Sequence, residues 1–111
     1  MPWLARAAAE GVDAYVLDFA CRGMADVGLL RDVPRHLRLG IGVIDVRSLE
    51  IEQPEQVAER IRKILENVSP ERVTLTTDCG MKQLPRPVAL GKLRSLAQGA
   101  GIVRRELSGR A

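Results

Sequence analysis

Three short β-type runs, two of them mainly apolar, are separated by longer helix-like segments and constrain the fold of this chain more than any other feature. The runs cover residues 12–19, 39–46 and 73–77. The first two are mainly apolar, as is typical of strands buried on both faces of a parallel sheet. Each connection between them is long enough to hold a helix, as a right-handed βαβ crossover requires. The pattern therefore predicts an α/β fold built from parallel βα units.

Four helical segments are expected around these strands, at residues 2–10, 24–31, 54–68 and 87–107. The strongest begins at Pro54 and carries its apolar residues at the spacing of one helix face. These residues are Val57, Ile61, Ile64, Leu65 and Val68. This helix is predicted to cover the sheet.

The last helix is expected to bury a stripe of small and apolar side chains. Its members are Ala89, Leu93, Leu96, Ala97, Ala100 and Val103. Gly91, Gly99 and Gly101 lie in the same segment, and each costs a helix about 1 kcal/mol relative to alanine. Glycines kept at that cost indicate either close approach of another element or fraying near the helix end.

Three strands are few for an independent parallel sheet, because each edge strand presents unpaired backbone groups. Two architectures are open: a small three-layer domain, or part of a larger barrel. In either case the 111 residues are close to the common domain size, so the chain is expected to form a single domain over residues 1–111.

The composition excludes several classes of function. Aromatic residues make up 3% of the chain and the net charge is +3, which argues against a module that binds nucleic acid by stacking bases. No apolar run approaches the ~20 residues needed to span a bilayer.

The two cysteines, Cys21 and Cys79, form no CxxC pair, so a self-contained zinc finger is excluded. Without a secretion signal, free thiols in a reducing cytoplasm are expected.

Each β-type run ends in, or is directly followed by, an aspartate and further polar residues. The aspartates are Asp18, Asp45 and Asp78. The polar residues that follow them include Cys21, Arg22, Arg47, Ser48, Cys79 and Lys82. Because the carboxyl ends of parallel strands share one edge, these side chains are predicted to line a polar cleft. The alternative for each aspartate is a helix cap or a turn.

Cys79 follows the third strand directly, where it could serve as a metal ligand or a nucleophile. The alternative is a small buried residue, since free cysteine is among the most buried types. The pair Gly40-x-Gly42 lacks the third glycine of a dinucleotide fingerprint, so close packing or a bulge explains it better. His36 is expected to be exposed in the loop before the second strand.

Three segments together resemble the C-terminal end of the catalytic barrel of cobalamin-independent methionine synthase and its single-barrel relatives. They are the run from Leu39 to Ser48, the helix beginning near Pro54, and the run from Asp78 to Lys82. The resemblance extends from about Gly11 to Leu107. It implies that the chain forms the last three βα units, of eight, in a TIM (β/α)8 barrel.

The resemblance also implies a zinc site. Family members hold zinc with a His-x-Cys pair, a glutamate and a late cysteine, and the zinc keeps the homocysteine sulfur as a thiolate. That thiolate takes the methyl group of 5-methyltetrahydrofolate, which carries a polyglutamate tail. Cys79 matches the late cysteine, and Asp18 stands at the glutamate's position with a side chain one methylene shorter. This sequence contains no counterpart of the His-x-Cys pair.

Arg47 occupies the position of the histidine that supplies the family's proton. Arginine cannot act as a general acid near neutral pH, although it can hold a phosphate, carboxylate or sulfonate. The replacement fits a sibling branch of thiol alkyltransferases with an anionic acceptor such as coenzyme M. By the same resemblance, Asp45, Ser48, Asp78 and Lys82 are expected to contact substrate.

The isolated chain is expected to show little or no methyl transfer, since two metal ligands are missing. The chain would then be a truncated copy, an excised fragment, or one component of a split enzyme whose barrel a second chain completes. The alternative is a non-catalytic fragment that acts as an interaction module, with exposed sheet edges covered by self-association or by a partner. Neither nucleic acid nor a membrane is expected as a partner.

Overall fold

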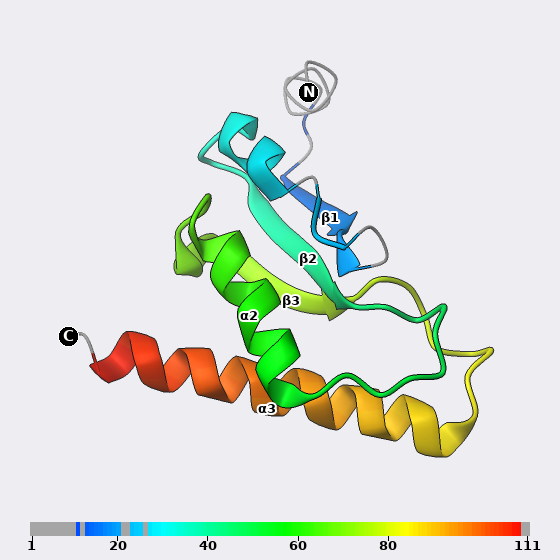
Figure 1. The fold of residues 1–111 in the computed structure, drawn as a ribbon. Coiled ribbons are helices and arrows are strands. Elements are labelled where there is room, and N and C mark those ends of the chain that lie inside the picture. The colour runs from blue at the N-terminus through cyan, green and yellow to red at the C-terminus, as the bar shows by residue number, and fades with distance from the viewer. Residues whose placement is uncertain (1–10, 12, 21–22, 26, 110–111) are drawn as a thin grey trace.

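The computed structural model describes residues 11, 13–20, 23–25 and 27–109. Its centre is a three-stranded sheet in the order β1-β2-β3, formed by β1 (Ala14–Asp18), β2 (Arg38–Ile44) and β3 (Val73–Thr77). Both strand pairs are parallel. All three strands point the same way in Figure 1, so their carboxyl ends share one edge of the sheet. The predicted parallel α/β fold is confirmed.

Two helices, α2 (Pro54–Leu65) and α3 (Arg86–Gly109), pack against each other and against one face of the sheet. The expected helix at 24–31 is instead a 3-10 helix, η2 (Val27–Asp32), and a second short one, η3 (Pro70–Arg72), precedes β3. The helix expected at 2–10 lies outside the described residues.

The start of α2 follows directly from its sequence. Pro54 fits the first helical turn, where its missing N–H is not needed, and the Gln56 side chain accepts a hydrogen bond from the Gln53 backbone N–H at 2.7 Å. The predicted apolar face of the helix is confirmed, because Val57, Ile61 and Ile64 are all buried.

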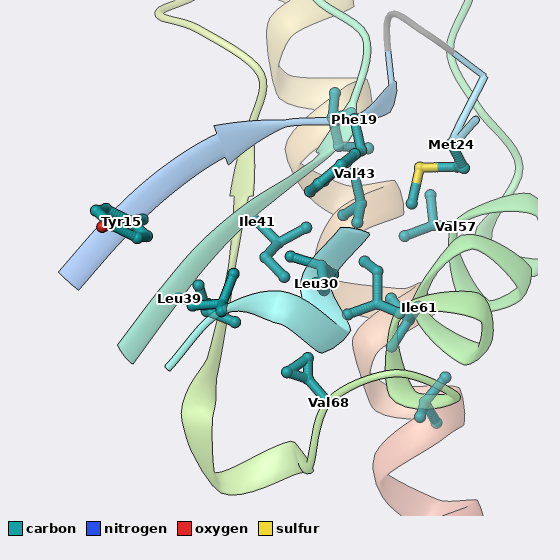
Figure 2. Close-up of a cluster of buried hydrophobic side chains, with 14 of the residues drawn as sticks. Tyr15, Phe19, Met24, Leu30, Leu39, Ile41, Val43, Val57, Ile61 and Val68 are labelled. Carbon is teal, nitrogen blue, oxygen red and sulfur yellow. The ribbon is translucent and has the colours of Figure 1, made fainter. Parts of the chain in front are cut away.

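The hydrophobic core lies between β2 and α2. Figure 2 shows Leu39, Ile41 and Val43 on the sheet side and Val57 and Ile61 on the helix side. Alternate residues of β2 point into this layer because side chains of a strand alternate between its faces. The core therefore fixes the face of the sheet on which both helices lie.

The opposite face of the sheet carries no covering layer in the described residues. Val16 of β1 is 71% exposed, and it pairs with Gly40, which pairs in turn with Thr74 of β3. The expectation that the first strand is buried on both faces is therefore wrong for this chain. Val16 and Thr74 are both exposed, so none of the described helices buries them.

The buried stripe of α3 also differs from the prediction. The buried residues are Lys92, Ser95, Gly99 and Val103, whereas Leu93 is 47% exposed. Small residues allow the helix to approach its neighbours closely on this face. The row that includes Leu93, Leu96 and Ala100 lies beside β3, where it lines an open groove of about 510 Å³.

Close approach explains two of the three glycines in α3. A Cβ at Gly91 would lie 2.5 Å from Ile51 Cδ1, and one at Gly99 would lie 2.6 Å from Val57 Cβ and 2.9 Å from the Pro54 carbonyl oxygen. Gly101 has nothing closer than Arg105 at 3.7 Å. Gly99 requires glycine because backbone and a buried side chain face it, whereas at Gly91 the exposed Ile51 side chain would have to move, and Gly101 has open space.

Gly99→Ala should therefore destabilise the chain by about 1–3 kcal/mol, the usual cost of overpacking a close contact. Gly101→Ala is the matched control in the same helix, and it should raise stability by up to about 1 kcal/mol through helix propensity. Urea unfolding followed by circular dichroism measures both. Equal effects at the two positions would contradict the close-packing explanation.

Candidate metal and substrate site

The site lies at the carboxyl edge of the sheet. Asp18 is the last residue of β1, and Asp78 and Cys79 directly follow β3, with β2 between them. Cys79 Sγ lies 3.7 Å from Asp18 Oδ2, within hydrogen-bonding range for sulfur. The structure thus brings together, from opposite edges of the sheet, the two side chains proposed from the sequence as metal ligands.

Gly42 makes this meeting across β2 possible. It pairs with Asp18 on one side and Thr76 on the other. A Cβ there would overlap the Asp78 carboxylate and lie 3.0 Å from Asp78 Cα. The pairing register shifts between Gly42 and Ile44. Close packing and a strand irregularity, both expected for this glycine pair, are therefore confirmed at Gly42.

Asp78 connects the ends of the outer strands. Its Oδ1 accepts a hydrogen bond from the Ala20 backbone N–H at 3.3 Å, and its side chain is buried. The loop after β1 is thereby held against the end of β3. This contact helps to explain why Asp18 and Cys79 meet.

The carboxylates around Cys79 raise the pKa of its thiol. The negative charge of Asp18 is the largest cause, followed by desolvation from neighbouring atoms, the hydrogen bond to Asp18 and the charge of Asp78. Each of these disfavours the thiolate, so the free thiol stays protonated and donates to Asp18. A bound cation would replace that proton, because metal ligation requires the thiolate.

Asp18→Asn should lower the pKa of the Cys79 thiol toward its ordinary value, since it removes the main negative charge beside the sulfur. The measurement is the pH dependence of alkylation in a Cys21→Ser background, so that one thiol reacts. Asp32→Asn, at the end of η2, is the control and should leave the pH dependence of alkylation unchanged. An unchanged curve for Asp18→Asn would contradict the contact.

A second cluster occupies the loop after β2. Asp45 Oδ1 accepts a hydrogen bond from the Arg47 backbone N–H at 2.9 Å and lies 3.7 Å from Arg47 Nε. Ser48 Oγ accepts a hydrogen bond from the Glu50 N–H at 3.1 Å. These are turn-forming contacts, in line with the alternative interpretation of Asp45. The Arg47 side chain and Lys82, in the loop after β3, are exposed.

The donor set fits part of a zinc site. A thiol and a carboxylate are both zinc ligands, but zinc takes at least three protein ligands. Among the residues that the structure describes, no group of three or more His, Cys, Asp and Glu side chains is placed to hold a metal ion. Cys21 and Arg22, also expected at this edge, lie outside the described residues.

Sequence reasoning missed a buried charged pair, Glu52 and Lys92, beneath the loop after β2. A signal was present in the helical spacing. Lys92 lies three residues after Ala89 and four before Leu96, so it falls on the face that the stripe was expected to bury. A lysine at such a position needs a buried partner, which Glu52 provides.

Comparison with known proteins decides between the two architectures that the sequence allowed. The model of the cobalamin-independent synthase catalytic domain matches residues 2–101. The chain belongs to the cobalamin-independent methionine synthase family. It is 42% identical over 97 residues to a methionine synthase of Thermococcus kodakarensis, covering 87% of this chain and 29% of that protein. A methionine synthase of Saccharolobus islandicus is 52% identical over 96 residues, covering 86% and 29%.

A solved structure supports the same assignment. The B12-independent methionine synthase from Shewanella sp. W3-18-1, in complex with selenomethionine, superimposes with a TM-score of 0.87 at 33% identity. The match covers 96% of this chain and 30% of that one. This chain therefore spans under a third of the length of these relatives, and its βα units form part of a TIM barrel. None of the described helices is long and apolar enough to cross a membrane.

Proposed function

We propose that this chain is the part of a cobalamin-independent methionine-synthase-type methyltransferase that contributes the last zinc ligand. Cys79 would be that ligand and Asp18 the carboxylate ligand. The observation that carries the proposal is their 3.7 Å approach across the sheet, in a chain of this family. Residues 1–111 would form one partial barrel domain.

In this proposal the reaction moves a methyl group from 5-methyltetrahydrofolate with its polyglutamate tail to the homocysteine thiol, in the cytoplasm. Zinc, when bound, supplies the Lewis acidity that keeps the acceptor sulfur deprotonated at neutral pH. Arg47 would bind an anionic group of a substrate, and Asp45 holds its backbone in place. Ser48, Asp78 and Lys82 would line the same edge.

Arg47 favours a second candidate within the family. A guanidinium stays protonated at neutral pH, so it cannot donate a proton to the departing group. It binds planar or tetrahedral anions well. The alternative is therefore a zinc-dependent thiol alkyltransferase whose acceptor carries an anion, as coenzyme M carries a sulfonate.

The proposal includes further βα units outside these 111 residues. Its support is the face of the sheet that no described residue covers, where Val16 is exposed, and the described residues, which place no group of three metal-ligating side chains. The isolated 111 residues should then turn over little or no substrate. If the chain is instead a non-catalytic interaction module, it should form metal-free dimers, which light scattering together with zinc analysis would detect.

A chimera tests the proposed activity. The matching C-terminal region of the Thermococcus kodakarensis relative is replaced by this chain, and methyl transfer is measured to homocysteine and to 2-mercaptoethanesulfonate. Transfer to homocysteine supports the first candidate, and preference for the sulfonate supports the second. Arg47→His should shift preference toward homocysteine. A folded, zinc-loaded chimera that methylates neither thiol would refute both.

A further inference from the structure

A buried ion pair lies beneath the loop of residues 45–53, which connects β2 to α2. Lys92 of α3 is 0% exposed and Glu52 of the loop is 7% exposed, and Lys92 Nζ lies 2.9 Å from Glu52 Oε1. Charges removed from water are costly unless they are paired and hydrogen-bonded. This pair meets that condition, and its contacts reach toward the candidate site.

The Glu52 carboxylate joins three elements. Its Oε2 accepts hydrogen bonds from the Asp45 backbone N–H at 2.9 Å and from Arg60 of α2 at 3.0 Å. Arg60 also donates to the Val43 carbonyl oxygen at 2.7 Å, at the end of β2. Burial raises the pKa of Glu52, but the hydrogen bonds from Lys92, Asp45 and Arg60 together lower it. The carboxylate therefore stays ionised at neutral pH.

The helix α3 holds the far part of the loop through polar contacts. Lys92 Nζ donates to the Glu50 carbonyl oxygen at 2.6 Å, and Ser95 Oγ donates to the Glu52 carbonyl oxygen at 2.5 Å. Apolar contacts also hold the loop, because Val46 is buried and Ile51 packs against Gly91 of α3, whereas Leu49 is exposed. The ion pair and its hydrogen bonds are the polar anchor of the loop, and they alone reach the Asp45 backbone through Glu52.

We infer that Glu52 and Lys92 are positioning residues for the candidate site. They fix the Asp45 backbone at the carboxyl end of β2, and the Asp45 carboxylate in turn holds Arg47. The role of the loop in binding an anionic substrate rests on the proposed function. The anchoring itself depends only on contacts within this chain.

A buried ion pair contributes little to the stability of a fold by itself. Apolar residues of similar volume commonly stabilise a fold as well or better. The pair adds geometric specificity, because the hydrogen bonds of a carboxylate and an ammonium hold several backbone groups in fixed positions. Positioning, rather than general stability, is the property that the pair is expected to control.

Amide hydrogen exchange of the 111-residue chain tests this inference without zinc or substrate. In Glu52→Gln/Lys92→Met, which removes both buried charges, the amides of Asp45, Arg47 and Glu50 should exchange about tenfold faster or more. The amides of Ile41 and Val43 in β2 should keep the rates of the unaltered chain. The readout is the ratio between the exchange rates of the loop amides and those of the β2 amides. A merely structural role would accelerate both sets of amides together and leave this ratio unchanged.

Two further variants complete the experiment. Arg62→Met/Glu106→Gln removes a different ion pair between α2 and α3, and it should leave the ratio unchanged. Glu52→Asp keeps both charges and shortens the reach of the carboxylate by one methylene, and it provides the test if the double variant does not fold. Unchanged loop exchange, or equal acceleration of loop and core, would overturn the inference. Because the readout needs no catalysis, failure of the proposed function would leave this result standing.

Discussion

Lys92→Met alone should lower the free energy of unfolding by about 3–5 kcal/mol, because it leaves a buried carboxylate without its main counter-charge. Glu52 would keep Arg60 and the Asp45 N–H, but it would lose the only ammonium within reach among the described residues. Lys92 also donates to Glu50, so a backbone carbonyl oxygen loses its partner as well. Urea unfolding of the 111-residue chain measures the loss.

The matched control is Glu52→Gln/Lys92→Met, in which neither charge remains. It should recover most of the stability, because two neutral residues of similar volume replace the pair. Arg62→Met, which breaks a partly exposed cluster on α2, should cost no more than about 1 kcal/mol. A loss below 1 kcal/mol in the single Lys92 variant would show that Glu52 is not stabilised by this lysine.

Cys79→Ser in the chimera with the Thermococcus kodakarensis relative should remove zinc and lower turnover at least about 100-fold. Even a residue that only supports a zinc ligand changes affinity or activity by about 10–100-fold, so loss of a thiolate ligand should cost more. Zinc per chain, measured by atomic emission, and initial rates provide the two readouts.

Asp18→Asn in the same chimera should weaken zinc binding less than the Cys79 change, because an amide oxygen can still coordinate a cation, though without charge. Asp32→Asn is the control and should alter neither zinc content nor rate. Full zinc loading in the Cys79→Ser chimera would exclude this cysteine as a ligand.

The sequence predicted the positions of the strands and of α2 well. The run around Leu39 is apolar, the run at residues 73–77 is rich in β-branched residues, and Val57 and Ile61 repeat at helical spacing. The position of Cys79 after a strand and the aspartate at the end of β1 likewise pointed to one edge of the sheet. These features depend on the local residue pattern and on the parallel topology of the strands. Both can be inferred from a single sequence.

What the sequence could not reveal depends on contacts between distant segments. Helical spacing places Lys92 beside the expected stripe, but its burial depends on Glu52, which lies 40 residues away, and hydrophobicity alone favoured Leu93 as core. Val16 was expected to be buried, but its face of the sheet lacks a covering layer in the described residues. The role of Gly42 likewise depends on a distant segment, because Asp78, which follows β3, packs directly against this glycine.

The central claim is that Cys79 and Asp18 hold the same metal ion, and anomalous X-ray scattering at the zinc edge tests it most directly. Crystals of the zinc-loaded chimera should show a single zinc about 2.3 Å from Cys79 Sγ and about 2.0–2.2 Å from an Asp18 carboxylate oxygen. A zinc bound by Cys79 with Asp18 outside its coordination shell, or no zinc beside Cys79, would contradict the claim.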